Sequence, residues 1–380
     1  MLGGLESDRV LLLPLLSATI VGFLGPGAVA PTPARGAGTD ALRAISSYGA
    51  MEKNFSAPKG LLWETHPRVR GQGYAKLWPY SQALAATLSV VKLRPRAGWP
   101  RRALRARLAA LEWYWNPQIR PAAYDASVGP PLAGRGDQYY DDNEWVALDL
   151  VEAHRAIGDR GTLLRARRLF EFVEHGWDRE SRHPCPGGVF WTRAAGVNDR
   201  NTVTTANGAV LALALYEATG SRHYLRWAQT MYEWVHRCMA APNGLFWDHI
   251  DLKGRVDATH WSYNQGLVIA ADTALYQVTH GARFLRAAEA VADAALDWFE
   301  DSADTEPPEF MSVFYRSLLR LQAEDPGRDY FTAAQAYADA AWARYRVRRT
   351  ALFSFGGRPD LLGQAAMVQL FADLATFGRD

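Results

Sequence analysis

The sequence predicts an all-α fold, an (α/α)6 barrel built from six helical hairpins. Beyond residue 39, almost every long segment has apolar residues at helical spacing, and strand patterns are scarce. Similar hairpins also recur along the chain, with Leu164, Leu225 and Leu285 at equivalent points 61 and 60 residues apart. A hairpin with two apolar faces cannot bury both faces alone, so the hairpins must stack on one another.

Twelve helices are expected, which makes six hairpins. We predict them near residues 40–54, 74–92, 100–116, 139–157, 162–177, 203–218, 222–239, 262–279, 282–300, 308–322, 330–346 and 361–377. The turns within hairpins are short, whereas the linkers between hairpins are long and rich in Gly, Pro and aromatic residues. The long linkers should therefore gather at one end, where the inner helices begin and where function is expected. An open solenoid is the alternative to a closed double ring.

The chain is expected to have two parts. Residues 1–38 form a signal-like or anchor segment with a linker, and residues 39–380 form the barrel domain. Residues 10–21 are an apolar run, too short for a stable membrane span, and a small-x-small pattern follows at residues 28–30. We expect a secreted or cell-envelope protein. A cytoplasmic protein is the alternative, because Glu6 and Asp8 precede the run, where a signal peptide is usually basic.

Charge and cysteine content exclude several classes of protein. The chain has 42 basic and 40 acidic residues, so its formal net charge of +2 gives no reason to expect a nucleic-acid partner. Cys185 and Cys238 are too few for a disulfide scaffold and lack metal-ligand spacing. They favour two buried free thiols, although a single bridge becomes an option if the protein is exported. We expect a monomer.

Polar and aromatic residues gather at the starts of the predicted inner helices. The chain has 14 Trp and 16 Tyr, whose flat apolar face and polar edge suit stacking against a sugar ring. We predict substrate contacts from Trp78, Tyr139, Tyr140, Trp191, Asn207, Trp247, Asp248, Tyr263, Asn264 and Gln265.

Asp141 and Asp142 stand side by side at one of these helix starts, directly after two tyrosines. A single Asp there is accounted for by capping of free backbone N–H groups, but two exceed what capping needs. Like charges at close range raise the pKa of one member of a pair. One ionised and one protonated carboxyl is the division of labour that glycoside hydrolysis requires. We therefore predict that Asp141 and Asp142 are catalytic.

Other chemistries lack their signatures. The sequence contains no HExxH pair of histidines, no Gly-rich phosphate loop after a strand and no GxSxG turn. We expect neither a metal site nor a cofactor. Asp257 is interpreted as a solvated loop residue.

The stretch YYDDNEWVALDLVEAHRAIGD, residues 139–159, resembles the signature helix of glycoside hydrolase family 76, the endo-α-1,6-mannanases. Five further segments match in the same order: LWPYSQAL at 77–84, GGVFWT at 187–192, NTVTTANGA at 201–209, GLFWDHID at 244–251 and SYNQGLVIAA at 262–271. The resemblance covers roughly residues 70–320. The Asp pair followed by YNQG is its most specific part.

This resemblance implies an (α/α)6 catalytic domain that cleaves α-1,6-mannosidic bonds in α-mannan or mannose-containing cell-wall glycans with retention. It implies Asp141 as nucleophile and Asp142 as general acid/base, and it implies no cofactor. One departure stands out. Family members often show a Phe-Lys-Gly run late in the chain, where residues 309–316 here read EFMSVFYR. Substrate contacts from that segment therefore stay open.

Two other readings compete with this one. An unsaturated-glycuronide hydrolase would need a cationic pocket for its substrate, and a sugar epimerase of the N-acylglucosamine type would need a pair of histidines. A non-catalytic glycan-binding protein would bind without turnover. Product analysis on mannan and on unsaturated uronides separates these alternatives.

Overall fold

The structure of the protein is a computed structural model, and it describes residues 36–377. It is built from two layers of α-helices. Inner helices are α2 (Leu77–Leu93), α4 (Tyr140–Ile157), α6 (Thr202–Thr219), α8 (Ser262–Thr279), α10 (Pro308–Glu324) and α12 (Leu361–Thr376). Outer helices are α1 (Gly36–Phe55), α3 (Gly98–Leu111), α5 (Arg160–His175), α7 (Arg222–Cys238), α9 (Ala282–Phe299) and α11 (Phe331–Arg344).

The two layers differ in sequence as their burial requires. In one hairpin, α6 buries 12 of its 18 residues, whereas α7 buries 6 of 17. A helix that is apolar on every side belongs in an interior, and α6 carries a single charged residue, Glu217, near its end. The outer helix α7 has an apolar stripe toward α6 and presents Arg226 and Arg237 on its other side.

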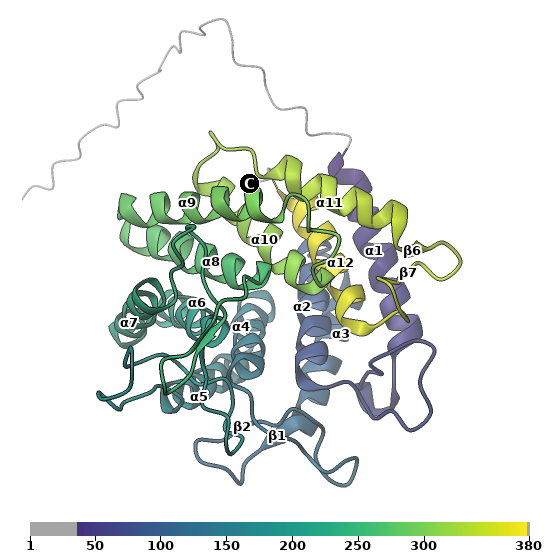
Figure 1. Ribbon diagram of the computed structural model, residues 1–380. Coiled ribbons are helices and arrows are strands. Elements are labelled where there is room, and N and C mark those ends of the chain that lie inside the picture. The colour runs from purple at the N-terminus through teal and green to yellow at the C-terminus, as the bar shows by residue number, and fades with distance from the viewer. Residues whose placement is uncertain (1–35, 378–380) are drawn as a thin grey trace, which may run out of the picture. The chain divides into compact units, whose positions relative to one another are not determined.

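The inner helices close into a ring. Each packs on the next, and α12 packs on α2, so no inner helix of the described chain is left at an open edge. The sixth hairpin joins the two ends of this chain, with α12 against α1 (Figure 1). These helices are antiparallel, because the Arg43 guanidinium lies over the Phe371 ring while Gln364 donates to the Ser47 carbonyl oxygen. The predicted barrel is confirmed, and the open solenoid is excluded.

The helix boundaries follow the prediction closely, with α8 ending and beginning where it was expected and α1 starting four residues early, at Gly36. Residues 1–35, which hold the predicted signal-like segment, lie outside the described residues, so that segment stays a prediction. Within residues 36–377, no helix is both long enough and apolar enough to cross a bilayer.

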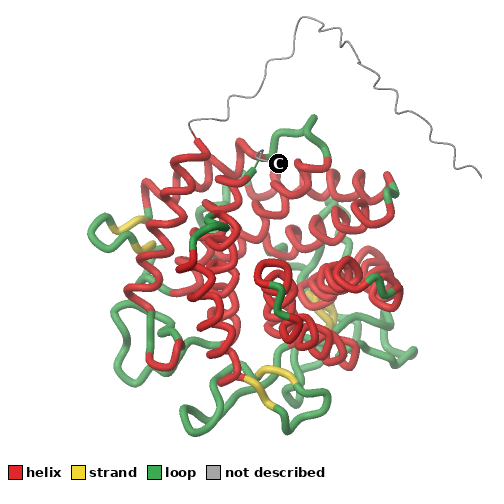
Figure 2. The backbone as a smooth tube through the Cα atoms, turned by 180° about the vertical axis from the view of Figure 1, so that it is seen from behind, coloured by secondary structure: helices red, strands yellow, loops and turns green. Residues whose placement is uncertain are grey.

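The β-structure of residues 36–377 is confined to the loops that follow outer helices (Figure 2). It consists of short antiparallel pairings, each two residues long. They are β1 (Trp115–Asn116) with β2 (Ala123–Tyr124), then β3 (Arg200–Asn201) with β4 (His249–Ile250) and β5 (Val256–Asp257), then β6 (Arg346–Val347) with β7 (Leu352–Phe353).

Amide side chains at a repeated position hold these loops over the ring. Asn143, Gln265 and Gln364 are each the fourth residue of an inner helix, and each is fully buried. Asn143 accepts from the Tyr124 N–H at 2.8 Å and donates to its carbonyl oxygen at 3.0 Å. Gln265 likewise accepts from the Phe246 N–H at 2.8 Å and donates to the Phe246 carbonyl oxygen at 3.0 Å. A buried amide that satisfies both groups of a loop residue fixes that loop's height above the helix.

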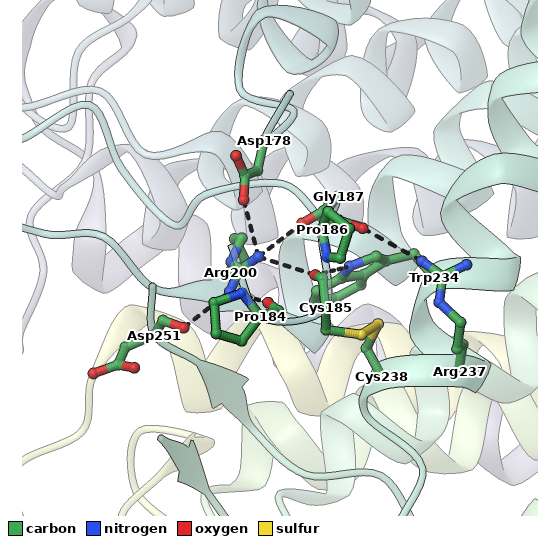
Figure 3. The surroundings of a disulfide bond; sticks show 10 residues. All are labelled: Asp178, Pro184, Cys185, Pro186, Gly187, Arg200, Trp234, Arg237, Cys238 and Asp251. Atoms are coloured by element: carbon green, nitrogen blue, oxygen red, sulfur yellow. Dashed lines mark hydrogen bonds and ion pairs between the residues drawn. A yellow bond between two sulfur atoms is a disulfide. The ribbon is translucent and has the colours of Figure 1, made fainter. Parts of the chain in front are cut away.

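The loop before α6 has a further tether. Cys185 in this loop forms a disulfide with Cys238 at the end of α7 (Figure 3). The prediction of two free thiols is therefore wrong. The two cysteines are 53 residues apart, and only the packing of the loop against α7 brings their Cα atoms to 6.0 Å. Gly188 in the same loop has φ +84°, and a Cβ there would come within 2.4 Å of the Trp234 ring.

Arg200 holds the same loop from the opposite side. This side chain is fully buried, and its guanidinium donates to the Asp178 carboxylate at 2.9 Å and to the carbonyl oxygens of Cys185 and Pro184 at 3.0 Å (Figure 3). It also reaches the Asp251 carbonyl oxygen at 2.9 Å in the next loop. The segment that leads to Trp191 is thus fixed at both ends.

Candidate active site

Asp141 and Asp142 lie in the first turn of α4, at the end of the barrel that carries the long loops. Neither is the N-cap, which is Tyr139, and Tyr139 makes no side-chain capping bond. The Asp141 carboxylate accepts the backbone N–H of Asp142 at 3.0 Å and the indole N–H of Trp191 at 3.3 Å. The Asp142 carboxyl accepts no hydrogen bond from residues 36–377. Capping therefore accounts for one oxygen of Asp141 and for none of Asp142.

These surroundings give the two carboxyl groups different acidities. Burial raises the pKa of Asp141 to about 6, while the hydrogen bonds from Asp142 and Trp191 oppose that rise. Burial and then the charge of Asp141 raise the pKa of Asp142 well above its usual range. The donated hydrogen bonds thus favour the ionised form of Asp141, whereas burial and the adjacent charge favour the protonated form of Asp142.

Aromatic side chains surround the pair on two sides. Tyr139 and Trp191 pack together with ring centroids 5.1 Å apart, and Trp191 is 37% exposed at the mouth. On the other side of the helical ring, the ring centroids of Tyr263 and Phe310 are 4.1 Å apart, and those of Phe310 and Trp78 are 6.0 Å apart. The indole nitrogen of Trp78 is buried without a hydrogen-bond partner in the described chain.

Phe310 is a site residue that the sequence interpretation missed. It joins aromatic residues of α2 and α8 from the first turn of α10. No polar cluster surrounds it in the sequence. The only signal available was its position at an inner-helix start in the segment left open above.

A second acidic group stands beside the pair. Asp248 accepts from the Asn264 amide at 3.0 Å and pairs with His249 Nδ1 at 2.8 Å. Burial, then the nearby charges of Asp248 and Asp141, raise the pKa of Tyr263 well above its usual range. Asp141, Asp248 and Tyr263 therefore share one neighbourhood, as the sequence predicted.

Of the remaining predicted contact residues, Tyr140 and Gln265 are engaged within the protein, whereas Trp247 and Asn207 stay predictions. Tyr140 is buried against Phe172, with ring centroids 4.4 Å apart, so its ring is part of the core. Gln265 clamps the loop at Phe246, as described above. Trp247 is half-buried and packs against the part of the core that the second half of the chain mostly forms.

Asn207 is fully buried in α6 beside Glu144, another residue that sequence reasoning did not single out. Burial, then the charge of Asp141, raises the pKa of Glu144 well above its usual range. Glu144 lies one turn after Asp141 on α4 and is fully buried.

One group of side chains in the described part of the chain has the geometry of a metal site. Each of Asp248, His249 and Asp257 offers one potential ligand atom, and these three atoms lie within 4.8 Å of one another. The hydrogen bond to Asp248 raises the pKa of His249, and bonds from Thr259 lower the pKa of Asp257. His249 and Asn264 already bond to the Asp248 carboxylate, and Thr259 donates to Asp257, so hydrogen bonds within the protein account for this group.

A closed helical ring with a pair of unequal carboxyl groups at its mouth defines a glycoside hydrolase of the (α/α)6 type. The sequence profile of glycosyl hydrolase family 76 matches residues 76–346, and the chain belongs to this family.

Individual relatives share parts of the sequence or the whole fold. A mannan endo-1,6-alpha-mannosidase of Saccharomyces cerevisiae is 32% identical over 128 residues, which are 31% of this chain and 27% of the yeast protein. The chain thus aligns with about a quarter of that relative's length.

Two solved structures show the fold. A family 76 mannosidase of Bacteroides thetaiotaomicron superposes with a TM-score of 0.80 at 22% identity, over 90% of this chain and 99% of that one. The second structure is an inactive variant of a Salegentibacter α-1,6-mannanase with two consecutive aspartates replaced and α-1,6-mannotriose bound. It superposes with a TM-score of 0.73 at 18% identity, over 89% of this chain and 99% of that one.

Proposed function

We propose that the protein hydrolyses α-1,6-mannosidic bonds in α-mannan or mannose-containing glycans and retains the anomeric configuration. The observation that carries this proposal is the unequal environment of two adjacent carboxyl groups. Asp141 is oriented by two N–H donors, whereas Asp142 has no donor in the described chain and a raised pKa. The yeast relative's name and the mannotriose complex support the choice of substrate.

Asp141 is the nucleophile in this scheme. Its ionised oxygen attacks the anomeric carbon of the mannosyl residue and forms a glycosyl ester as the bond to the leaving oxygen breaks. Asp142 gives its proton to that leaving oxygen in the same step. It then takes a proton from water, which attacks the anomeric carbon and releases Asp141.

The substrate contacts come from the groups around this pair. Trp191 and Tyr139 offer one aromatic wall, and Trp78, Tyr263 and Phe310 offer another. Asp248, fixed by Asn264 and His249, is placed to accept hydrogen bonds from sugar hydroxyls.

The alternatives have less support. Family membership disfavours a glycuronide hydrolase or a sugar epimerase. An epimerase would also need histidines at the reacting carbon, and no histidine of residues 36–377 bonds to Asp141 or Asp142.

We propose that the protein works outside the cytoplasm. The disulfide between Cys185 and Cys238 supports this, because structural disulfides persist in oxidising compartments. The signal-like residues 10–30 point in the same direction.

Incubation with linear α-1,6-mannan tests the proposed function. Reducing ends should appear, and proton NMR of the first products should show the α anomer before mutarotation. Release of the β anomer would overturn the retaining scheme. Full inertness toward the linear chain and its oligosaccharides would overturn the substrate assignment.

A further inference from the structure

A cavity lies next to Asp248 at the loop end of the barrel. Its volume is about 510 Å³, within the range of ligand-binding pockets. The loops before α6 and α8 form it, and neither Asp141 nor Asp142 lines it. Its lining includes Asn198, Asp199, His249, Lys253, Val256 and Asp257.

The small sheet made of β3, β4 and β5 contributes one wall of this cavity. His249 and Asp257 are directly opposite partners on β4 and β5. Opposite residues of an antiparallel pair project from the same face of a sheet. Both side chains line the cavity, so this face of the sheet is turned toward it.

This wall is in direct contact with the residues assigned to the main-chain sugar. The Nδ1 atom of His249 lies 2.8 Å from the Asp248 carboxylate, and a carboxylate oxygen of Asp257 lies within 4.8 Å of one of Asp248. A sugar held by Asp248 is therefore one side chain away from the cavity.

The charges in the cavity suit a neutral ligand. Asp251 and Arg255 satisfy each other through a contact of 2.7 Å. Asp199, Asp257 and Lys253 also line the cavity, together with His249, which is bonded to Asp248. Acidic and basic groups are therefore mixed in the lining, and together they offer acceptors and donors for hydroxyls.

Val256 adds the apolar component that a sugar requires. It is 38% exposed and lies on β5, among the charged residues. A pyranose presents an apolar C–H face and a rim of hydroxyls, and here Val256 lines the cavity from the opposite face of the sheet to His249 and Asp257, so apolar and polar contacts come from different sides.

We propose that the cavity binds a sugar residue that branches from the main chain, so that the preferred substrate is a substituted α-1,6-mannan. This proposal rests on the proposed function, because it takes the main chain to be held at Asp248. The ligand class is a neutral monosaccharide or disaccharide side branch.

The test compares two oligosaccharides with the same α-1,6-linked backbone, one bare and one carrying α-1,2-mannosyl branches. We expect the wild-type protein to prefer the branched one in kcat/KM. Val256→Trp adds a large ring to the lining of the cavity and should lower the branched-to-bare ratio by about tenfold. Val347→Trp is the matched control, since Val347 is 39% exposed on β6, in another loop, and should leave the ratio unchanged. A milder variant, Lys253→Ala, should lower the ratio by about threefold through the loss of one donor.

Direct binding separates failure of the proposal from failure of the proposed function. Calorimetric titration of the Asp142→Asn protein measures affinity without turnover. Tighter binding of the branched ligand, lost on adding Val256→Trp but not Val347→Trp, supports the pocket even if the wild-type protein cleaves neither chain. Equal affinities, or an equal loss for both ligands, would overturn it. Selective binding of Ca²⁺ or Zn²⁺ by the wild-type protein, abolished by Asp257→Asn, would assign the wall to a metal and also overturn it.

Discussion

Two ionisable groups at the loop end of the barrel, Arg200 and Asp142, have opposite surroundings. The Arg200 guanidinium, fully buried, donates to a carboxylate and to carbonyl oxygens from two loops. The Asp142 carboxyl accepts nothing from residues 36–377, and its pKa is raised by burial and by Asp141. A buried guanidinium bonded to a carboxylate and to carbonyl oxygens of two loops holds structure together, whereas a carboxyl that receives no hydrogen bond is available for chemistry.

The largest expected effect breaks the chemistry and leaves the fold intact. Asp141→Asn and Asp142→Asn should each lower the rate on linear α-1,6-mannan by about 10²–10⁴-fold, since each removes a covalent or a proton-transfer role. Azide should restore turnover of an activated mannoside in Asp142→Asn only, because that variant keeps the nucleophile. Rescue of Asp141→Asn by azide would reverse the two roles.

The same variants should gain stability. The pKa of both carboxyls is raised on folding, so the folded state holds more protons than the unfolded chain from about pH 4 to pH 6. Stability conferred by the protonated carboxyls is therefore lost as the pH rises through that interval. At pH 7, thermal unfolding of Asp142→Asn should occur at a higher temperature than that of the wild type.

Substitution of Arg200 should instead lower the stability of the fold. Arg200→Met leaves Asp178 without its main partner and should lower the free energy of unfolding by about 3–5 kcal/mol. Arg182→Met is the control in the same loop, because Arg182 is 86% exposed, and it should change stability by less than about 0.5 kcal/mol. Urea unfolding measures both. A small change in Arg200→Met would mean that the disulfide alone fixes the loop.

Removal of that disulfide should have a somewhat smaller effect. The double variant Cys185→Ser/Cys238→Ser should lose about 2–4 kcal/mol of stability, since the bond closes a long loop. Its unfolding curve should not respond to dithiothreitol, whereas the wild-type curve should shift toward that of the variant. An unshifted wild-type curve under reducing conditions would contradict a stabilising role.

The smallest effect concerns the indole bond to Asp141. The acidic limb of kcat/KM should lie near pH 6, where Asp141 ionises. Replacing Trp191 with Phe removes a donor to the ionised form, so the pKa of Asp141 and the acidic limb should move upward by about half a unit to one unit. Trp298→Phe, at an exposed position on α9, should leave the limb in place. A downward shift would show that the indole does not stabilise the charged carboxylate.

Local pattern and chain position were enough to predict the fold. The spacing of apolar residues places α8 at residues 262–279, as found, because one long helix dominates its own local signal. The ends of α11 differ because the chain turns into β6 by residue 346, and no local apolar pattern marks that turn. The pairing of Cys185 with Cys238 depends on tertiary packing, which residue spacing does not show.

The site was predicted in part for the same reason. Asp141, Asp142 and Tyr263 are neighbours because equivalent helix starts meet at one end of a ring, and Asp248 joins them from the loop before α8. Motif position alone does not say which way a side chain turns. Tyr140 therefore proved to be core, and Phe310, with no motif around it, was overlooked.

The antiparallel contact of α1 with α12 places the two ends of the described chain at the same seam of the ring. A short turn from Phe377 to Gly36 would make this sixth hairpin resemble the other five, and the chain could then be opened at another hairpin turn, such as Gly220. Circular permutation succeeds at surface turns where the original ends are close together. The barrel therefore has no required starting helix, and a permuted chain opened at Gly220 should keep both aspartates in one uninterrupted segment.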